Sequence, residues 1–448
     1  MPTPTSQQQC ICALATPPGR GALAIVRLSG NDSLSLAEKI TQRSLIARRA
    51  TYTNFVSNDG STIDQGLVIY FQAPASFTGE DVVEFQCHGN PLLAEALLKT
   101  LCSYGARLAT PGEFSLRAFL NNKIDLTQAE AIADLINSTT EQGLRSANRS
   151  LKGAFSSRVT NVLNNLIQVR MHIEAHLDFP DEEIDRQQHQ QIETKLKGLS
   201  ASITELLVQA KLGERLQTGA SIAIAGKPNA GKSSLLNLLA QSEVAIVTEI
   251  PGTTRDPLTA DIEIKGMPVR LIDTAGLRDT QDVVEAEGIA RAQQALQQAD
   301  LILWLTDVMQ DAKEKIPDDL DSENVLQVHN KIDLTQSHNF GPSEIAISAK
   351  TNTGIRQLIE KIADKLFQQQ GLQEHGETPF LARSRHVVAL QQALQHCQAC
   401  QSRISTAQEL ELAAEDLRQA QQQLSEITGE FSADDLLGKI FSEFCIGK

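Results

Sequence analysis

A glycine-rich loop between two apolar runs is the first group of residues suited to chemistry. Residues 221–225 read SIAIA, residues 226–233 read GKPNAGKS, and the apolar run SLLNLLA follows. A strand, a tight loop and a helix in this order form a P-loop, whose backbone amides surround phosphate groups. Lys232 would reach the β- and γ-phosphates and assist catalysis, and Ser233 would offer its hydroxyl to Mg²⁺. The predicted loop contacts are Gly226, Asn229, Ala230, Gly231, Lys232, Ser233 and Ser234.

Further motifs follow apolar runs that read as strands. The run VRLI ends in DTAG at 273–276, where Asp273 would hold Mg²⁺ through water and Gly276 would donate its amide to the γ-phosphate. Between the P-loop and DTAG lies PGTTRD, whose Thr254 is placed to complete the Mg²⁺ shell. Strand ends that carry such groups predict the triphosphate side of a nucleotide site, with contacts from Thr254, Asp273, Thr274, Ala275 and Gly276.

The base is specified by NKID at 330–333, which follows the run VLQV. Asp333 can accept hydrogen bonds from the N1 and N2 donors of guanine, and adenine has no such pair. The segment SAK, which follows the run IAI, would complete the pocket. The sequence therefore predicts GTP as the nucleotide, bound on the base side by Asn330, Lys331, Asp333, Ser348, Ala349 and Lys350.

Hydrolysis requires an oriented water, and many GTPases place a glutamine directly after DTAG for this purpose. Here that position is Leu277, which can neither donate nor accept a hydrogen bond. Glu285 is one carboxylate within reach in the following loop, and its rivals are Asp279, Asp282 and Glu287.

The sequence also leaves open which group supplies positive charge at the phosphates. Arg255 or Arg278 could supply an arginine finger, or a cation could replace it. Asn229 could ligate a monovalent cation through its amide oxygen, or serve only as a turn residue.

The pattern of apolar and turn-forming residues changes around this nucleotide segment. Residues 1–120 hold short β-like runs separated by turns and predict an α+β domain. Residues 121–215 and 376–448 are helical in pattern, and residues 216–375 alternate strands with helices, as in a doubly wound parallel sheet. We therefore expect a multidomain α/β and α protein whose P-loop GTPase domain is inserted into a helical domain. Two separate helical bundles, one on each side of the GTPase domain, would show the same residue pattern.

Composition narrows the class of protein. The net charge is −15, the pI is near 5.1 and aromatic residues make up 4%, so neither a nucleic-acid coat nor an aromatic stacking platform is expected. Seven scattered cysteines predict reduced thiols. No basic leader and no membrane-length apolar run is present, so we expect a cytoplasmic protein without a membrane span.

The chain as a whole resembles the MnmE family of tRNA modification GTPases. The resemblance rests on ATPPGRGALAIVRLSG, PGEFSLRAFLNNKIDLTQAEAIADLI, LDFPDEEID and the terminal FCIGK, together with the nucleotide motifs. It implies a homodimer that works with an FAD-dependent partner of the MnmG (GidA) type. The pair would add an aminomethyl or carboxymethylaminomethyl group to C5 of the wobble uridine of certain tRNAs, with 5-formyl- or methylene-tetrahydrofolate as the one-carbon donor.

The resemblance also assigns residues. Matching positions for folate, in the N-terminal domain that also builds the dimer, are Arg27, Glu84, Lys123 and Lys448. Those for K⁺, which activates the GTPase when its domains pair, are Asn229, Thr248, Ile250 and Thr253, and those for Mg²⁺ are Ser233 and Thr254. Glu249 and Gly252 join the nucleotide contacts. Glu285 falls on the catalytic glutamate, and Cys445 in the terminal CIGK is a further candidate for chemistry.

Two other functions fit the sequence less well. The first is a binding switch that docks on RNA or the ribosome, which usually carries a basic module after its GTPase domain; here acidic and glutamine-rich helices follow. The second is an inactive scaffold, disfavoured because Lys232, Ser233, Asp273 and Asp333 are all present.

Two metal-like spacings are interpreted as structural. The pair His172 and His176 lacks a glutamate directly after the first histidine, and the pair Cys397 and Cys400 lies in a helical run without a second pair.

Overall fold

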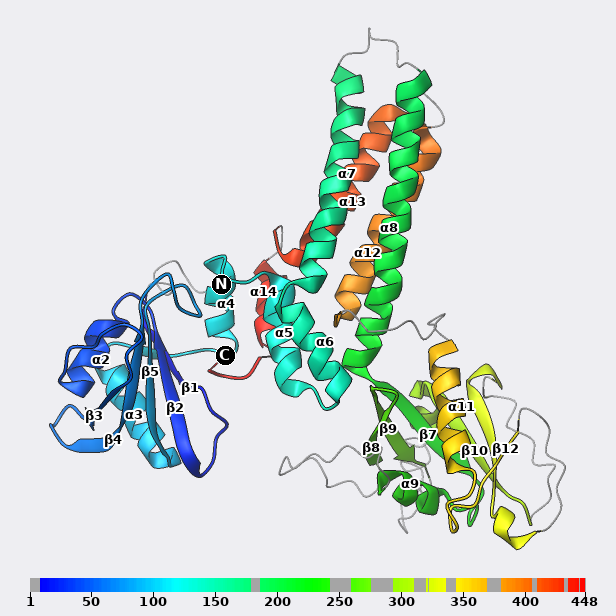
Figure 1. The fold of residues 1–448 in the computed structure, drawn as a ribbon, viewed down its shortest axis with the longest axis horizontal. Coiled ribbons are helices and arrows are strands. Elements are labelled where there is room, and N and C mark those ends of the chain that lie inside the picture. Colours follow the sequence, from blue (N-terminus) through cyan, green and yellow to red (C-terminus); the bar gives the residue numbers. More distant parts are fainter. Residues whose placement is uncertain are drawn as a thin grey trace. The chain divides into compact units, whose positions relative to one another are not determined.

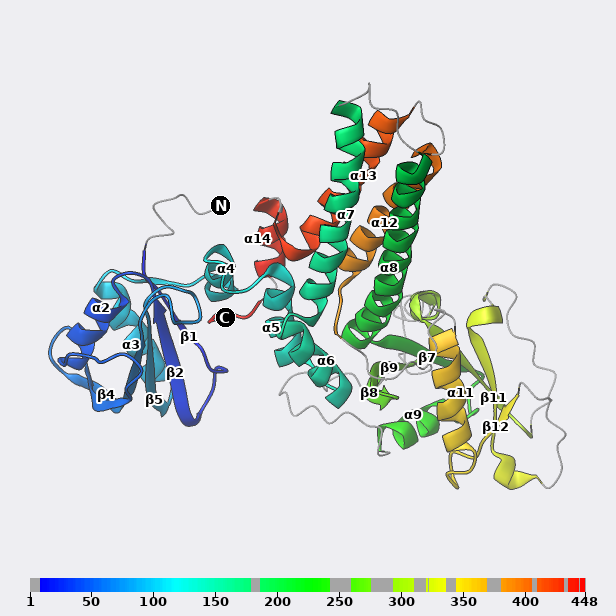
Figure 2. The same ribbon diagram turned by 45° about the horizontal axis from the view of Figure 1, so that its top comes forward.

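The computed structural model describes residues 9–178, 186–241, 259–274, 293–309, 320, 322–335, 344–368, 380–404, 409–430, 434–442 and 444–447. The chain divides into two compact units, one of Met1–Ala133 with Gln421–Lys448 and one of Asp134–Ala420. Each unit contains its own six-stranded sheet (Figures 1 and 2).

The sheet of the first unit has the strand order β3-β4-β5-β2-β1-β6, and only the pair β1 and β6 is parallel. Helices α2 (Ser33–Thr41) and α3 (Pro91–Ser103) supply Leu36, Ile40, Leu97 and Leu101 to a core shared with the sheet. The predicted α+β character of this region is confirmed. The strands are β1 (Ile11–Leu14), β2 (Gly21–Ser29), β3 (Thr51–Val56), β4 (Thr62–Phe71), β5 (Val82–Gly89) and β6 (Arg107–Leu108).

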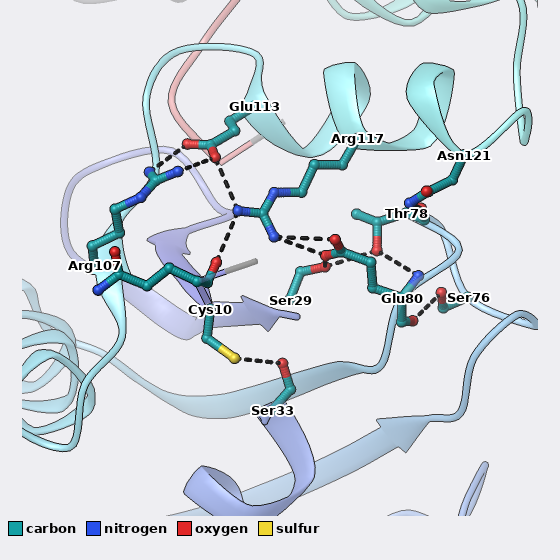
Figure 3. Close-up of polar contacts among 11 residues, drawn as sticks. Cys10, Ser29, Ser33, Ser76, Thr78, Glu80, Arg107, Glu113, Arg117 and Asn121 are labelled. Atoms are coloured by element: carbon teal, nitrogen blue, oxygen red, sulfur yellow. Dashed lines mark hydrogen bonds and ion pairs between the residues drawn. The ribbon is translucent and has the colours of Figure 1, made fainter. Parts of the chain in front are cut away.

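Helix α4 (Glu113–Leu120) is tied to this sheet by charged side chains (Figure 3). The Arg117 guanidinium donates to the Glu80 carboxylate at 2.9 Å and to Glu113 at 3.1 Å. Glu113 also accepts from Arg107 at 2.7 Å. Because both Arg117 and Glu113 are buried, removing one partner would leave an uncompensated charge. The network therefore fixes α4 and the loop that precedes β5.

The remaining helices of the first unit form a small apolar cluster. Helix α14 (Asp434–Ser442) packs Leu437, Ile440 and Phe441 against Leu126 and Ala129, which lie at the start of α5 (Leu126–Asn137).

Long helices form a bundle in the second unit. Helix α8 packs against both α7 and α12 (Figure 1). Since α7 and α8 precede the second sheet and α12 follows it, the α/β segment is an insertion into one helical domain, as predicted, and the alternative of two separate bundles is wrong. The helices are α6 (Glu141–Leu151), α7 (Ala154–Asp178), α8 (Arg186–Thr218), α12 (Ser384–Ile404) and α13 (Leu410–Thr428).

The returning chain is anchored where it re-enters the bundle. Phe380 stacks on Phe155 with ring centroids 4.6 Å apart, and both rings are fully buried. The Leu381 amide donates to the Ser150 hydroxyl at 2.9 Å, and Arg383 pairs with Asp134 at 2.9 Å.

The second sheet has the strand order β12-β11-β10-β7-β9-β8, with all neighbours parallel except β8 and β9. Alternate residues of its strands enter two cores, since Ile224 and Leu303 belong to one cluster and Ala225 and Ile302 to another. Burial of both faces confirms the doubly wound prediction. The strands are β7 (Ala220–Gly226), β8 (Thr259–Ile264), β9 (Met267–Asp273), β10 (Leu301–Asp307), β11 (Val325–Asn330) and β12 (Ile345–Ala346).

Strand β7 occupies the position where the chain changes direction across this sheet. The chain continues from β7 to β8 and β9 on one side, and then to β10, β11 and β12 on the other. In doubly wound sheets ligands bind outside the carboxyl ends of the strands at such a switch point. The loop after β7 is therefore the expected binding position.

Within the described residues, no helix combines the length and the apolarity that a membrane span requires.

Replacing Phe380 with alanine removes the ring that stacks on Phe155 and leaves a cavity in the bundle. We expect Phe380→Ala to destabilise the second unit by about 3–5 kcal/mol, seen as a lower urea midpoint in far-UV circular dichroism. Met171→Ala is the control, because Met171 is 61% exposed on α7 and should change stability by less than about 0.5 kcal/mol. Equal midpoints for Phe380→Ala and wild type would contradict the anchoring role.

Candidate functional site

The P-loop follows β7 as a loop that depends on glycine. Gly226, Asn229 and Gly231 have φ angles of 140°, 67° and 95°, and α9 (Lys232–Ala240) begins directly afterwards. A Cβ atom at Gly226 would collide with the Leu305 carbonyl, and one at Gly231 with the Asn330 side-chain amide. The helix N-terminus and the close-packed backbone together form the cradle that an anionic phosphate requires.

Lys232 and Ser233 point toward the same end of the sheet. The Lys232 ammonium donates to the carbonyls of Gly226 and Lys227, each at 2.8 Å, and so lies over its own loop. The Ser233 hydroxyl donates to the Asp273 carboxylate at 2.6 Å. A hydroxyl beside a carboxylate is a pair of hard oxygen donors, which suits Mg²⁺. The residues present therefore fit a Mg²⁺–nucleotide complex.

Thr274 has a structural task. Its hydroxyl donates to the Ile224 carbonyl of β7 at 2.9 Å, which holds the end of β9 beside the P-loop.

The buried side chain of Asn330 joins the phosphate side to the base side. Its amide nitrogen donates to the Ala230 carbonyl at 2.9 Å, and its oxygen accepts from the amides of Lys331 at 2.8 Å and Ala349 at 3.0 Å. Asn330 is only 2% exposed. The sequence assigned Asn330 to the base pocket, and its contacts show that it also connects the three loops that form the pocket.

The carboxylate that would recognise guanine lies at the surface. Asp333 is exposed and accepts from the Ser348 hydroxyl at 2.6 Å through one carboxylate oxygen. Ser348 is itself buried and accepts from the Thr351 amide at 3.2 Å. Asp333 is thus oriented from one side by Ser348, while Lys350 beside it is exposed.

One acidic residue of this site was missed by sequence reasoning. Asp307, the last residue of β10, forms an ion pair with Lys331 at 2.7 Å and accepts from the Met309 amide at 3.0 Å. Burial of Asp307 opposes its ionisation, but the hydrogen bonds from Lys331 and Met309 outweigh burial and lower its pKa. The run LILWLTD carried the signal, because an acidic side chain ended an apolar strand at the ligand-binding edge.

Several predicted residues lie outside the described part of the chain. They include the nearby carboxylates and arginines that were alternatives for catalysis. The predicted site residues concerned are Thr248, Glu249, Ile250, Gly252, Thr253, Thr254, Ala275, Gly276, Glu285 and Lys448.

In the first unit, Arg27 and Glu84 are cross-strand neighbours on β2 and β5 and pair at 2.8 Å. The Arg27 guanidinium lies 5.7 Å from the centroid of the Phe77 ring. The Lys123 ammonium donates to the Pro74 carbonyl at 2.9 Å. Because Pro74 and Phe77 belong to one loop, the structure gathers Arg27, Glu84 and Lys123 around that loop.

The terminal segment packs on the same unit. The Gly112 amide donates to the Cys445 carbonyl at 3.5 Å, and the Cys445 side chain is exposed. Gly447 has a φ angle of 94°, and a Cβ atom there would collide with the Leu14 carbonyl. Gly447 therefore lies beside the end of β1, and the thiol of nearby Cys445 is accessible.

The described residues contain no cluster of three or more potential metal ligands. Cys397 and Cys400 are buried in α12, and burial raises the pKa of both thiols to about 12. His172 bonds through Nδ1 to the Gln168 carbonyl of its own helix.

Comparison with known proteins covers both units. The family model of the MnmE helical domain matches residues 126–445, and that of the N-terminus of the GTP-binding protein TrmE matches residues 10–123. The tRNA modification GTPase MnmE of Francisella tularensis subsp. novicida (strain U112) is 47% identical over 451 residues, which cover 98% of this chain and 99% of that protein. Its counterpart in Francisella philomiragia subsp. philomiragia is 46% identical over 453 residues, with the same coverage.

A solved structure of the G domain of the T. maritima FeoB iron transporter matches 33% of this chain and 98% of its own, with 24% identity and a TM-score of 0.23. The assignment rests on the family models and the relatives matched along 98% of the chain, which show that this chain belongs to the MnmE family of tRNA modification GTPases.

Proposed function

We propose that this tRNA modification GTPase is activated by K⁺ and acts as a homodimer in the cytoplasm with an FAD-dependent partner. Together they add an aminomethyl or carboxymethylaminomethyl group to C5 of the wobble uridine of certain tRNAs, with a tetrahydrofolate one-carbon donor. The observation that carries the GTPase part is the joined site, in which Ser233 meets Asp273 at 2.6 Å and Asn330 bonds to the P-loop at 2.9 Å.

The residues have separate tasks in hydrolysis. Ser233 and Thr254 would hold Mg²⁺, with Asp273 reaching it through water, and the bound ion would neutralise charge at the phosphates. Lys232 binds the phosphate oxygens, and Asp333 selects guanine. Glu285 orients the attacking water, which Leu277 cannot do.

The K⁺ site is proposed from Asn229, Thr248, Ile250 and Thr253. A cation at this position would supply the charge that an arginine finger supplies in other GTPases. The exposed Asn229 side chain on the P-loop supports the proposal, because its amide oxygen is a hard donor.

The folate site is proposed around the loop that contacts Arg27 and Lys123. Two cationic side chains suit the carboxylates of a folate tail, and Glu84 can accept from the donors of a pterin ring. Lys448 would add a third cation, and the exposed Cys445 thiol is a candidate nucleophile next to this unit's sheet.

The salt dependence of GTP turnover tests the roles of the cation and of Glu285. We expect GTP turnover to be at least tenfold faster in KCl than in matched NaCl, and Glu285→Ala to lower turnover in KCl by about 10²–10³-fold with GDP affinity unchanged. Steady-state phosphate release and fluorescent GDP titration measure the two effects. Equal rates in both salts would remove the cation from the mechanism.

A glycine at position 229 separates the two roles of Asn229. Asn229→Gly keeps the left-handed backbone, since Asn229 has a φ of 67°, and removes the side chain with its amide oxygen. We expect this variant to bind GDP normally and to lose the preference for KCl. A variant that still prefers KCl would assign Asn229 to the turn alone.

The base preference follows from Asp333. An asparagine there presents one donor and one acceptor in place of two acceptors, which matches the carbonyl at C2 of xanthine. We expect Asp333→Asn to weaken GTP binding by at least about tenfold and to favour xanthosine triphosphate. Competition binding with both nucleotides measures the change, and an unchanged preference for GTP would exclude Asp333 as the base selector.

The folate site is tested without the modification reaction. We expect Arg27→Ala and Lys123→Ala each to weaken 5-formyltetrahydrofolate binding by about tenfold or more, measured by calorimetry, and to leave GTP turnover unchanged. Lys99→Ala is the matched control, because Lys99 forms an exposed ion pair with Glu95 on α3 of the same unit. Wild-type folate affinity in both variants would move the site elsewhere.

A further inference from the structure

The carboxyl end of β10 carries a charged residue that no nucleotide motif includes. Asp307 lies directly across from Asn330 in the parallel pairing of β10 with β11. Asp307 is 8% exposed, so its charge is held away from water. A carboxylate in this position is retained only when it is paired and hydrogen-bonded. The residue that pairs with it is Lys331, the second residue of NKID.

Two interactions join the end of β10 to the start of the base loop, and a third orients Asp307 within its own turn. Lys331 Nζ lies 2.7 Å from one Asp307 oxygen, and the Met309 amide donates to the other at 3.0 Å. The Val308 amide donates to the Asn330 carbonyl at 3.1 Å. Both oxygens of Asp307 are thus used, one in its own turn and one on the neighbouring strand.

The ion pair holds a backbone conformation that lysine does not favour. Lys331 has a φ of 70°, in the left-handed region, and the short helix Ile332–Leu334 begins at the next residue. Asp333 lies within this helix, and its carboxylate accepts from the Ser348 hydroxyl. The direction of the Asp333 carboxylate therefore depends on the conformation of Lys331.

We infer that Asp307 is a positioning residue for guanine recognition, which acts by fixing Lys331 and thereby the base-selecting carboxylate of Asp333. Asp307 touches neither the base nor the phosphates in this role. Its loss displaces the base loop and leaves the P-loop, Ser233 and Asp273 as they are. The inference predicts a defect in base discrimination and not in the chemical step.

The test compares Asp307→Asn with wild type in the full chain. Titrations with fluorescent GDP and IDP measure the selective effect, because the inosine base lacks the 2-amino group that Asp333 would accept from. We expect GDP affinity to fall about tenfold, IDP affinity to fall several-fold less, and kcat for GTP at saturation to stay within about twofold while KM rises.

A double-mutant cycle tests the route through Lys331. Asp307→Asn combined with Lys331→Met should bind GDP no more weakly than the worse single variant, because both changes break one interaction. The Lys331 side chain is 32% exposed, so Lys331→Met should fold even if Asp307→Asn folds poorly. In that case Lys331→Met alone should show the same narrowed preference for GDP over IDP.

A matched control lies on the same sheet. Asp261→Asn breaks the exposed pair of Asp261 with Arg270, which spans 3.0 Å between β8 and β9, and should leave GDP and IDP affinities unchanged. GDP affinity of Asp307→Asn within twofold of wild type would overturn the inference. So would an equal loss of GDP and IDP affinity, or a fall in kcat with unchanged KM.

Discussion

A single buried amide, that of Asn330, sets the geometry on which the nucleotide site depends. It donates to the Ala230 carbonyl of the P-loop and accepts from the Lys331 and Ala349 amides of the two base loops. Each buried group left without a partner costs about 1–3 kcal/mol, so the three loops are stable in one mutual arrangement. Because β11 is separated from β7 by β10, this arrangement also requires the parallel strands to end level with one another.

In the first unit, buried charged side chains hold a loop in the way that Asn330 does in the second. Arg117 reaches from α4 to Glu80, which lies in the loop that also carries Pro74 and Phe77 (Figure 3). That loop contacts Lys123 through Pro74 and Arg27 through Phe77. In both units a buried polar side chain positions a loop outside the sheet, whereas apolar packing holds the sheet and its helices together. Hydrogen bonds and ion pairs are directional, so they fix the orientation of a loop in a way that dispersion contacts do not.

How much could be predicted from the sequence depends on how local each feature is. The P-loop was predictable because its strand, loop and helix are contiguous through residue 240, and the helices that became α7 and α12 were visible as runs without glycine or proline. The pairs Asp307–Lys331 and Glu80–Arg117 were not, because their partners are 24 and 37 residues apart. Such pairs depend on strand order and register, which a local pattern does not specify.

The two ends of the nucleotide site sustain backbone strain in different ways. Asn229 in the P-loop and Lys331 in the base loop both have left-handed φ angles, of 67° and 70°. Asparagine tolerates this region through its short polar side chain, so residue type alone accounts for position 229. Lysine has no such compensation, and a left-handed residue of this kind costs about 1–2 kcal/mol. Its side chain is held by Asp307 on another strand, so the geometry of the NKID loop depends on a residue outside that motif.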